Sequence, residues 1–134
     1  MLTDAQIKSI GISDSKVVAI RSLTDKITSG ELDLYELNKC SDETIVKILL
    51  SLRGIGNWTV KMYMLFVLDK QDILTFEDAA FLQSYCWIYK TNNRNKETVI
   101  KKCQKWNPCS SIAPRYLYHA LDMGLTKQEF HLYK

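Results

Sequence analysis

Hydrophobic residues recur along most of the chain at spacings of three and four, which places them on one face of an α-helix. Over residues 13–30 this stripe consists of Val17, Ile20, Leu23 and Ile27. A second stripe covers 45–52, and over 58–69 the apolar residues are nearly continuous, which is typical of a helix buried on most sides. No segment alternates apolar and polar residues as a half-buried strand does. The pattern predicts an all-α fold.

Residues that cap helices stand at the starts of these segments. A side-chain oxygen just before a helix accepts a hydrogen bond from a backbone amide that the helix leaves unpaired. We expect such caps at Thr3 paired with Gln6, Ser13, Asp33 paired with Glu36, Ser41, Asn57, Thr75 paired with Asp78, and Ser111. Gly30, Pro108 and Gly124 are expected to end helices.

Two glycines one residue apart interrupt the apolar, helix-forming segment SLRGIGNWTVKMYML at 51–65. They predict a short hairpin at 52–56 between helices over 41–51 and 57–69. Two interpretations fit this hairpin. It is either a plain corner between two helices, or a phosphate site in which glycine amides and the positive end of the second helix face an anion.

The composition is that of a soluble globular protein. Of the 134 residues, 46% are hydrophobic and 25% are charged, which fits one domain with a core of its own. No apolar run is long enough to span a membrane, and the polar start MLTDAQIKSIG lacks a signal-peptide core. We therefore expect a cytoplasmic protein without a membrane partner.

The net charge of +3 is small, but basic residues gather in one segment of the chain. They are Arg94, Lys96, Lys101, Lys102 and Lys105, beside a single acid, Glu97. Two interpretations stay open for this run. It is either a solvated helix face or a surface that adds to the binding of a nucleic acid.

The four cysteines, Cys40, Cys86, Cys103 and Cys109, form no C-x-x-C pair. Neither a zinc site nor a disulfide framework is therefore indicated. We expect reduced thiols that are mostly buried.

Four motifs in order resemble the helix-hairpin-helix DNA glycosylase superfamily, whose members also carry a glycine/proline-rich loop and an aspartate. LRGIGNWTV at 52–60 is similar to the family's L-P-G-I-G-x-W-T-A, and DILTFED at 72–78 is similar to its aspartate loop. WNPCSS at 106–111 is similar to W-x-P-[YW]-R-S, and the segment from Gly11 resembles the one that precedes the hairpin. The similarity covers residues 3–125 and is greatest to the bacterial 3-methyladenine DNA glycosylase II group.

This resemblance implies an enzyme of base excision repair that hydrolyses the N-glycosidic bond of alkylated purines of the 3-methyladenine type. Asp78 matches the catalytic aspartate, whose carboxylate stabilises the oxocarbenium-like sugar and orients the attacking water. The alternative is that Asp78 serves only as the capping-box partner of Thr75 at the start of the following helix. Trp58 stands where strand-cutting relatives carry a Schiff-base lysine, which implies a monofunctional enzyme with Trp58 as a wall of the base pocket. The alternative is a tryptophan of the core.

For the hairpin, the resemblance implies contacts with the phosphate backbone of DNA that do not depend on the base sequence. Damaged double-stranded DNA is the expected partner, bound by Arg53, Gly54, Ile55, Gly56, Asn57 and Lys61. The backbone carbonyls of Leu50, Leu52 and Ile55 are expected to hold a monovalent cation that bridges to a phosphate. No other cofactor is expected, and no iron-sulfur cluster, because the four-cysteine motif of some relatives is absent.

Family members carry further helices before the part that this chain matches, so we expect an N-terminally short, single helical domain over 1–134. Self-association or a complementary chain is expected to cover the apolar surface on which those helices pack. Two other functions stay open. One is a non-catalytic helix-hairpin-helix module that binds DNA without turnover, and the other is a helical interaction domain with no role on DNA.

Overall fold

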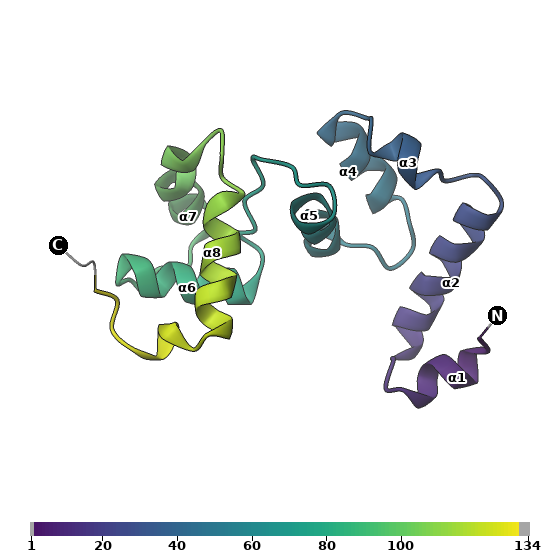
Figure 1. The fold of residues 1–134 in the computed structure, drawn as a ribbon, viewed down its shortest axis with the longest axis horizontal. Helices are drawn as coiled ribbons and strands as arrows, with labels where there is room; N and C mark the ends of the chain where they lie inside the picture. Colours follow the sequence, from purple (N-terminus) through teal and green to yellow (C-terminus); the bar gives the residue numbers. More distant parts are fainter. Residues whose placement is uncertain (1, 132–134) are drawn as a thin grey trace. The chain divides into compact units, whose positions relative to one another are not determined.

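The computed structural model describes residues 2–131, and this part of the chain is all helical (Figure 1). The helices are α1 Asp4–Ser9, α2 Asp14–Thr28, α3 Leu34–Leu37, α4 Asp42–Leu50, α5 Asn57–Phe66, α6 Ala79–Tyr89, α7 Lys96–Cys103 and α8 Ile112–Asp122, with the short 3-10 helices η1 Gln104–Trp106 and η2 Leu125–Lys127. The all-α prediction is confirmed. In the described segment no helix combines the length and the apolar content that crossing a membrane requires.

The chain divides into two compact units, an N-terminal unit Met1–Val60 and a C-terminal unit Lys61–Lys134. The boundary falls within α5, so the first turn of this helix belongs to the N-terminal unit and the rest to the C-terminal unit. The expectation of one domain over 1–134 stays a prediction.

Side-chain caps start the helices of the N-terminal unit much as the sequence predicts. Thr3 and Gln6 form a reciprocal capping box, in which the Thr3 amide donates to the Gln6 side-chain oxygen at 2.8 Å. Asp33 accepts from two amides of α3 at 2.8 and 3.1 Å, and Ser41 accepts from the amide three residues on at 3.3 Å. Ser13 stands at the predicted cap position but its side chain makes no capping bond. The local pattern therefore fixed where these helices begin.

The core of the N-terminal unit is made by aliphatic side chains of its helices and of the turns between them. Helix α1 packs against α2 (Figure 1). The buried side chains are those of Ile7, Val17, Leu32, Leu37, Ile45, Leu49, Leu52 and Val60. Of the stripe predicted on α2, Ile20 and Ile27 are 41% and 39% exposed. Helical spacing thus predicted the helix correctly but not the burial of its apolar face.

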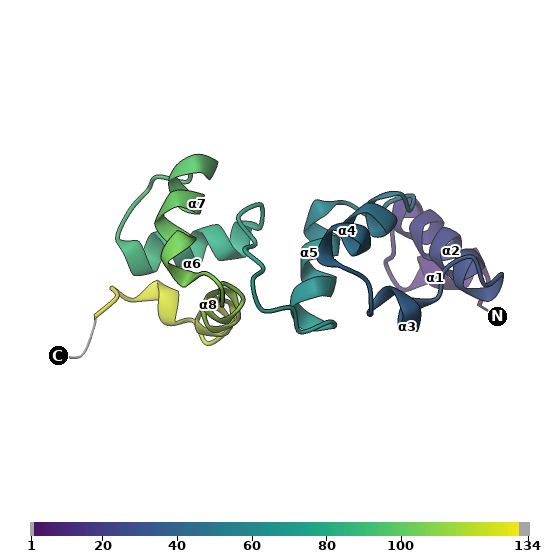
Figure 2. The ribbon, with the colours of Figure 1, turned by 90° about the horizontal axis from the view of Figure 1, so that it is seen from above.

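In the C-terminal unit, α6 packs on α8, and α7 closes the core that the two helices share (Figure 2). The cluster consists of Phe81, Tyr85, Val99, Cys103 and Leu117, all at most 5% exposed. The Ser84 hydroxyl, fully buried, donates to the Leu117 carbonyl at 3.1 Å and ties α6 to α8. Leu74 and Phe76, in the segment that leads to Asp78, pack against this cluster.

The four cysteines differ in exposure more than the sequence suggests. All four are free thiols, but only Cys103 is buried, Cys40 and Cys86 are half-buried, and Cys109 is exposed. The expectation of mostly buried thiols was therefore wrong. Burial raises the pKa of the Cys103 thiol to about 11.

The difference between Cys109 and Cys103 predicts selective labelling. With a pKa of about 11, roughly one part in a thousand of Cys103 is thiolate at pH 8, and the thiolate is the reactive form. We expect a thiol-alkylating reagent at pH 8 to modify Cys109 within minutes and to leave Cys103 unmodified until the chain is unfolded, as peptide mass spectrometry would show. Equal labelling of the two in the native protein would contradict this packing of α7.

Candidate functional site

The glycine hairpin joins α4 to α5 within the N-terminal unit. The Ile55 amide donates to the Leu52 carbonyl at 3.2 Å and closes the turn. The Val60 amide donates to the Gly56 carbonyl at 3.0 Å, which is the first bond of α5. Helix α5 begins at Asn57 itself, so the prediction of Asn57 as its cap was off by one residue. The predicted helix-hairpin-helix is confirmed, with α5 ending at Phe66 rather than at 69.

The two glycines of the hairpin have different roles. Gly54 has φ +81°, and a Cβ built on it would lie 2.5 Å from the Cβ of Ala19 on α2. The turn therefore packs directly on α2, and only glycine fits there. Gly56 has no such φ and nothing within 4 Å of a built Cβ. Gly54 is thus needed by the fold, whereas Gly56 leaves open space next to the backbone.

The hairpin presents its backbone and polar side chains to solvent. Arg53, Gly54, Gly56 and Asn57 are exposed, while Leu52 between them and α4 is 5% exposed and anchors the turn. Trp58 is 52% exposed, which disagrees with the alternative of a core tryptophan. Exposed amides at the start of a helix are what an anion requires.

The carbonyls predicted to hold a cation belong to this same hairpin. The Leu52 carbonyl already accepts the Ile55 amide, but a carbonyl oxygen has two lone pairs and can bind a cation as well. Oxygen ligands of this kind suit hard cations. Among residues 2–131, no group of three or more histidine, cysteine or carboxylate side chains could hold a metal ion.

In the C-terminal unit, the start of the aspartate loop (residues 72–78) and the two residues before it are fastened to the turn before α8. Ser111, which is 3% exposed, donates its hydroxyl to the Lys70 carbonyl and accepts the Ile73 amide at 2.9 Å. Its amide donates to the Gln71 carbonyl at 2.9 Å. The Asp72 carboxylate accepts the Ser110 amide at 3.1 Å. The two serines that end the motif at 106–111 therefore hold the aspartate loop in place.

Farther along the loop, Thr75 and Tyr118 connect it to α8. Thr75 is 1% exposed, and its hydroxyl accepts the Tyr118 hydroxyl at 2.9 Å. Burial raises the pKa of Tyr118 to about 12, to which the charge of Asp78 and a hydrogen bond with its carboxylate also contribute. Tyr118 thus reaches both residues, and at neutral pH it keeps the proton that it donates.

Asp78 is the N-cap of α6. Its carboxylate oxygen Oδ1 accepts the Phe81 amide at 2.8 Å, and its own amide donates to the Thr75 carbonyl at 2.9 Å. The predicted box, with Thr75 as the cap, was wrong, because Thr75 is three residues too early and its hydroxyl binds Tyr118 instead. A carboxylate has about four acceptor positions, so capping through one oxygen does not exclude chemistry by the other.

Lys61 lies on the aspartate loop rather than toward solvent. Its ammonium donates to the Leu74 carbonyl at 2.9 Å and to the Glu77 carboxylate at 2.6 Å, and it stands 3.6 Å from the centre of the Phe76 ring. Burial lowers the pKa of Lys61, and the bond to Glu77 and its charge oppose that shift. No local pattern predicts this arrangement, because Glu77 is sixteen positions away from Lys61.

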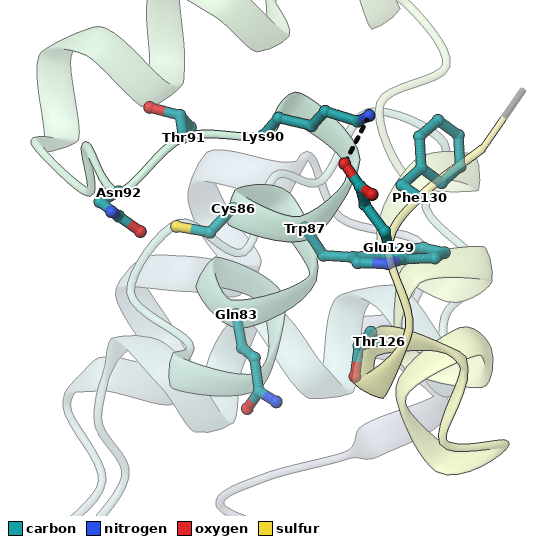
Figure 3. Close-up of a pocket in the computed structure, with 9 residues that line it drawn as sticks. All are labelled: Gln83, Cys86, Trp87, Lys90, Thr91, Asn92, Thr126, Glu129 and Phe130. Atoms are coloured by element: carbon teal, nitrogen blue, oxygen red, sulfur yellow. Dashed lines mark hydrogen bonds and ion pairs between the residues drawn. The ribbon is translucent and has the colours of Figure 1, made fainter.

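A cavity of about 420 Å³ lies elsewhere in the C-terminal unit, between the end of α6 and the segment after η2 (Figure 3). Trp87 forms one wall, with the Phe130 ring edge-on at 4.8 Å, and Lys90 pairs with Glu129 at 3.2 Å. None of the residues predicted from the sequence to form the site lines it. The cavity is therefore separate from the site that the sequence predicts.

Comparisons with known proteins agree with the motifs. The chain is 26% identical over 113 residues to the DNA-3-methyladenine glycosylase 1 of Schizosaccharomyces pombe. It matches the crystal structure of a DNA-3-methyladenine glycosidase from Bacillus halodurans with a TM-score of 0.77 and 28% identity over 96% of the chain. A 3-methyladenine DNA glycosylase of Schizosaccharomyces pombe, solved in complex with abasic DNA, has the same fold, with a TM-score of 0.80 and 22% identity over 90% of the chain. No family model matches the chain.

These likenesses confirm the resemblance to the DNA glycosylase superfamily and its helical fold. The chain spans only part of each relative: 50% of the curated protein and 59% and 60% of the two solved chains. What the full-length relatives do is therefore carried over to this chain only as a proposal.

Proposed function

We propose that this chain, a relative of the DNA-3-methyladenine glycosylases, acts as a monofunctional DNA glycosylase that removes alkylated purines of the 3-methyladenine type in base excision repair. One observation carries the proposal: Asp78, at the motif position of the catalytic aspartate, sits at the start of α6 on a loop fastened along its length. A group that must act on one bond needs such a fixed position.

The proposed reaction is hydrolysis of the bond between the damaged base and its deoxyribose. A glycosylase first extrudes the nucleotide from the duplex, at a cost of a few kcal/mol in stacking. As the base departs, positive charge develops on the sugar, and the half-buried Asp78 carboxylate would stabilise that charge and orient the water. The exposed indole of Trp58 would stack on the base, since the face of an indole attracts a cationic alkylated purine.

The hairpin would bind the DNA backbone. Its exposed residues Arg53, Gly54, Gly56 and Asn57, with the half-buried Ile55, would face a phosphate, and a monovalent cation on the carbonyls of Leu50, Leu52 and Ile55 would add charge. Lys61 leaves this group, because its ammonium is engaged by the aspartate loop.

Basic side chains of the C-terminal unit would add salt-sensitive affinity for DNA. The ammonium groups of Lys102 and Lys105 lie 4.6 and 5.0 Å from the centre of the Tyr89 ring, and that of Lys96 lies 4.8 Å from the Phe76 ring. These contacts order the lysines while their charge stays on the surface. Contacts of this type position DNA without reading its sequence. A cytoplasmic, nucleoid-associated location fits this partner, and self-association or a complementary chain stays a prediction.

The test is release of 3-methyladenine from methylated duplex DNA, with binding of the same duplex measured in parallel. We expect the chain to liberate the free base and to bind DNA with an affinity that falls as salt is raised. Salt-dependent binding without base release would instead leave the non-catalytic DNA-binding module as the function. Absence of both would leave only a helical interaction domain.

A further inference from the structure

The aspartate loop is fastened from three sides, and the contribution of Lys61 is the one that no motif explains. Ser111 holds the start of the loop and Tyr118 holds Thr75. Lys61 holds the loop on either side of Thr75, through the Leu74 carbonyl and the Glu77 carboxylate. Its position on α5 is rigid because that part of the helix is packed in the C-terminal unit, where Met64 and Leu65 are 2% and 0% exposed.

The chemistry of these contacts is specific to an ammonium group. Three donors on one nitrogen serve a neutral carbonyl, a carboxylate and the face of the Phe76 ring at the same time. The Lys61 side chain is 23% exposed and that of Glu77 is 34% exposed, so the pair is partly shielded from solvent. An uncharged side chain would leave the Leu74 carbonyl and the Glu77 carboxylate without this donor.

The loop has little freedom to shift at Glu77 without moving Asp78. The two residues are adjacent, and the Asp78 amide is bonded back to the Thr75 carbonyl at 2.9 Å, so residues 75–78 form one tight turn. Lys61 binds this turn on one side and Tyr118 binds it on another. If Lys61 is replaced and Glu77 shifts, the shift is therefore transmitted to Asp78 through the one peptide unit that joins the two residues.

We infer that Lys61 is a positioning residue of the glycosylase reaction. Its contacts with Leu74 and Glu77 fix the segment before Asp78 and thereby orient the Asp78 carboxylate toward the sugar. The inference rests on the proposed function, but the anchoring itself does not. It replaces the phosphate contact expected for Lys61 from the sequence.

The test compares Lys61→Met with Lys90→Met. Both remove the ammonium of a lysine that pairs with a glutamate in the C-terminal unit, but the partner of Lys90 is Glu129, which lies outside the aspartate loop. For Lys61→Met we expect the single-turnover rate of base release at saturating enzyme to fall about 10- to 100-fold, as misplacement of a reacting group does. The Kd for abasic duplex should stay within about two-fold of wild type. Lys90→Met should keep the wild-type rate.

Hydrogen exchange of the peptide covering 72–80 provides a readout that does not need activity. Lys61→Met should raise its exchange rate and Lys90→Met should not. Glu77→Gln keeps the contacts of Lys61 with the Phe76 ring and the Leu74 carbonyl, so it should raise the exchange rate of this peptide by a smaller amount. This variant provides the test if Lys61→Met does not fold. If the wild type releases no base, the proposed function fails, while exchange still decides whether Lys61 holds the loop.

Two results would overturn the inference. One is an unchanged rate of base release in Lys61→Met. The other is a weaker Kd with a salt dependence reduced by about one ion, which would identify Lys61 as a phosphate contact.

Discussion

Replacement of Asp78 by asparagine is expected to lower the rate of base release by about 10²- to 10⁴-fold while the protein stays folded and still binds DNA. Asparagine caps a helix about as well as aspartate, so the bond to the Phe81 amide that starts α6 is kept. What is lost is the negative charge that would stabilise the sugar cation. Single-turnover release from methylated duplex, with the melting temperature alongside, measures the two effects separately.

Two further variants separate catalysis from capping. Asp78→Ala removes both the charge and the cap, and should cost about 1 kcal/mol of stability in addition to activity. Asp72→Asn is the matched control, because Asp72 lies on the same loop, also accepts one backbone amide, and has no proposed role in the reaction. If Asp78→Asn released base at the rate of Asp72→Asn, Asp78 would be a cap and nothing more.

The two hairpin glycines are expected to respond in opposite ways to alanine. Gly54→Ala should lower the free energy of unfolding by about 2 kcal/mol or more, because alanine at φ +81° is strained and its methyl would meet Ala19 at 2.5 Å. Gly56→Ala should leave stability nearly unchanged, because nothing lies within 4 Å of the added carbon. Denaturant titration monitored by circular dichroism measures both.

This difference in stability determines which variant tests DNA binding by the hairpin. Weaker binding by Gly54→Ala would report a damaged turn, whereas weaker binding by the stable Gly56→Ala would report a ligand that approaches the backbone there. We expect Gly56→Ala to bind duplex DNA several-fold more weakly than wild type. Wild-type affinity in Gly56→Ala would leave the hairpin as a plain corner between two helices.

The sequence predicted the helices and the hairpin because the signals for them are local. Thr3, Asp33 and Ser41 cap the helices that follow them, and Gly54 has the positive φ that the turn suggested. The close approach of that turn to Ala19 could not be predicted, since it depends on how α2 packs.

The contacts that fasten the aspartate loop could not be predicted for the same reason. Thr75 and Asp78 are both good caps, but the Thr75 hydroxyl binds Tyr118, forty-three positions away, and Asp78 is the residue that caps α6. The motif position of Lys61, one helical turn after Trp58, predicted a phosphate contact, but Glu77 and the Leu74 carbonyl engage its ammonium. Position within a motif made Asp78 the candidate catalytic residue, whereas its surroundings depend on tertiary partners.

The most direct test of the central claim is one reaction of the wild-type chain with methylated duplex DNA, analysed for three products. We predict free 3-methyladenine, an equal number of abasic sites, and strands that stay intact until they are treated with alkali, because Trp58 cannot form the imine through which strand-cutting relatives act. Duplex that is bound but keeps all its methylated bases would contradict the claim.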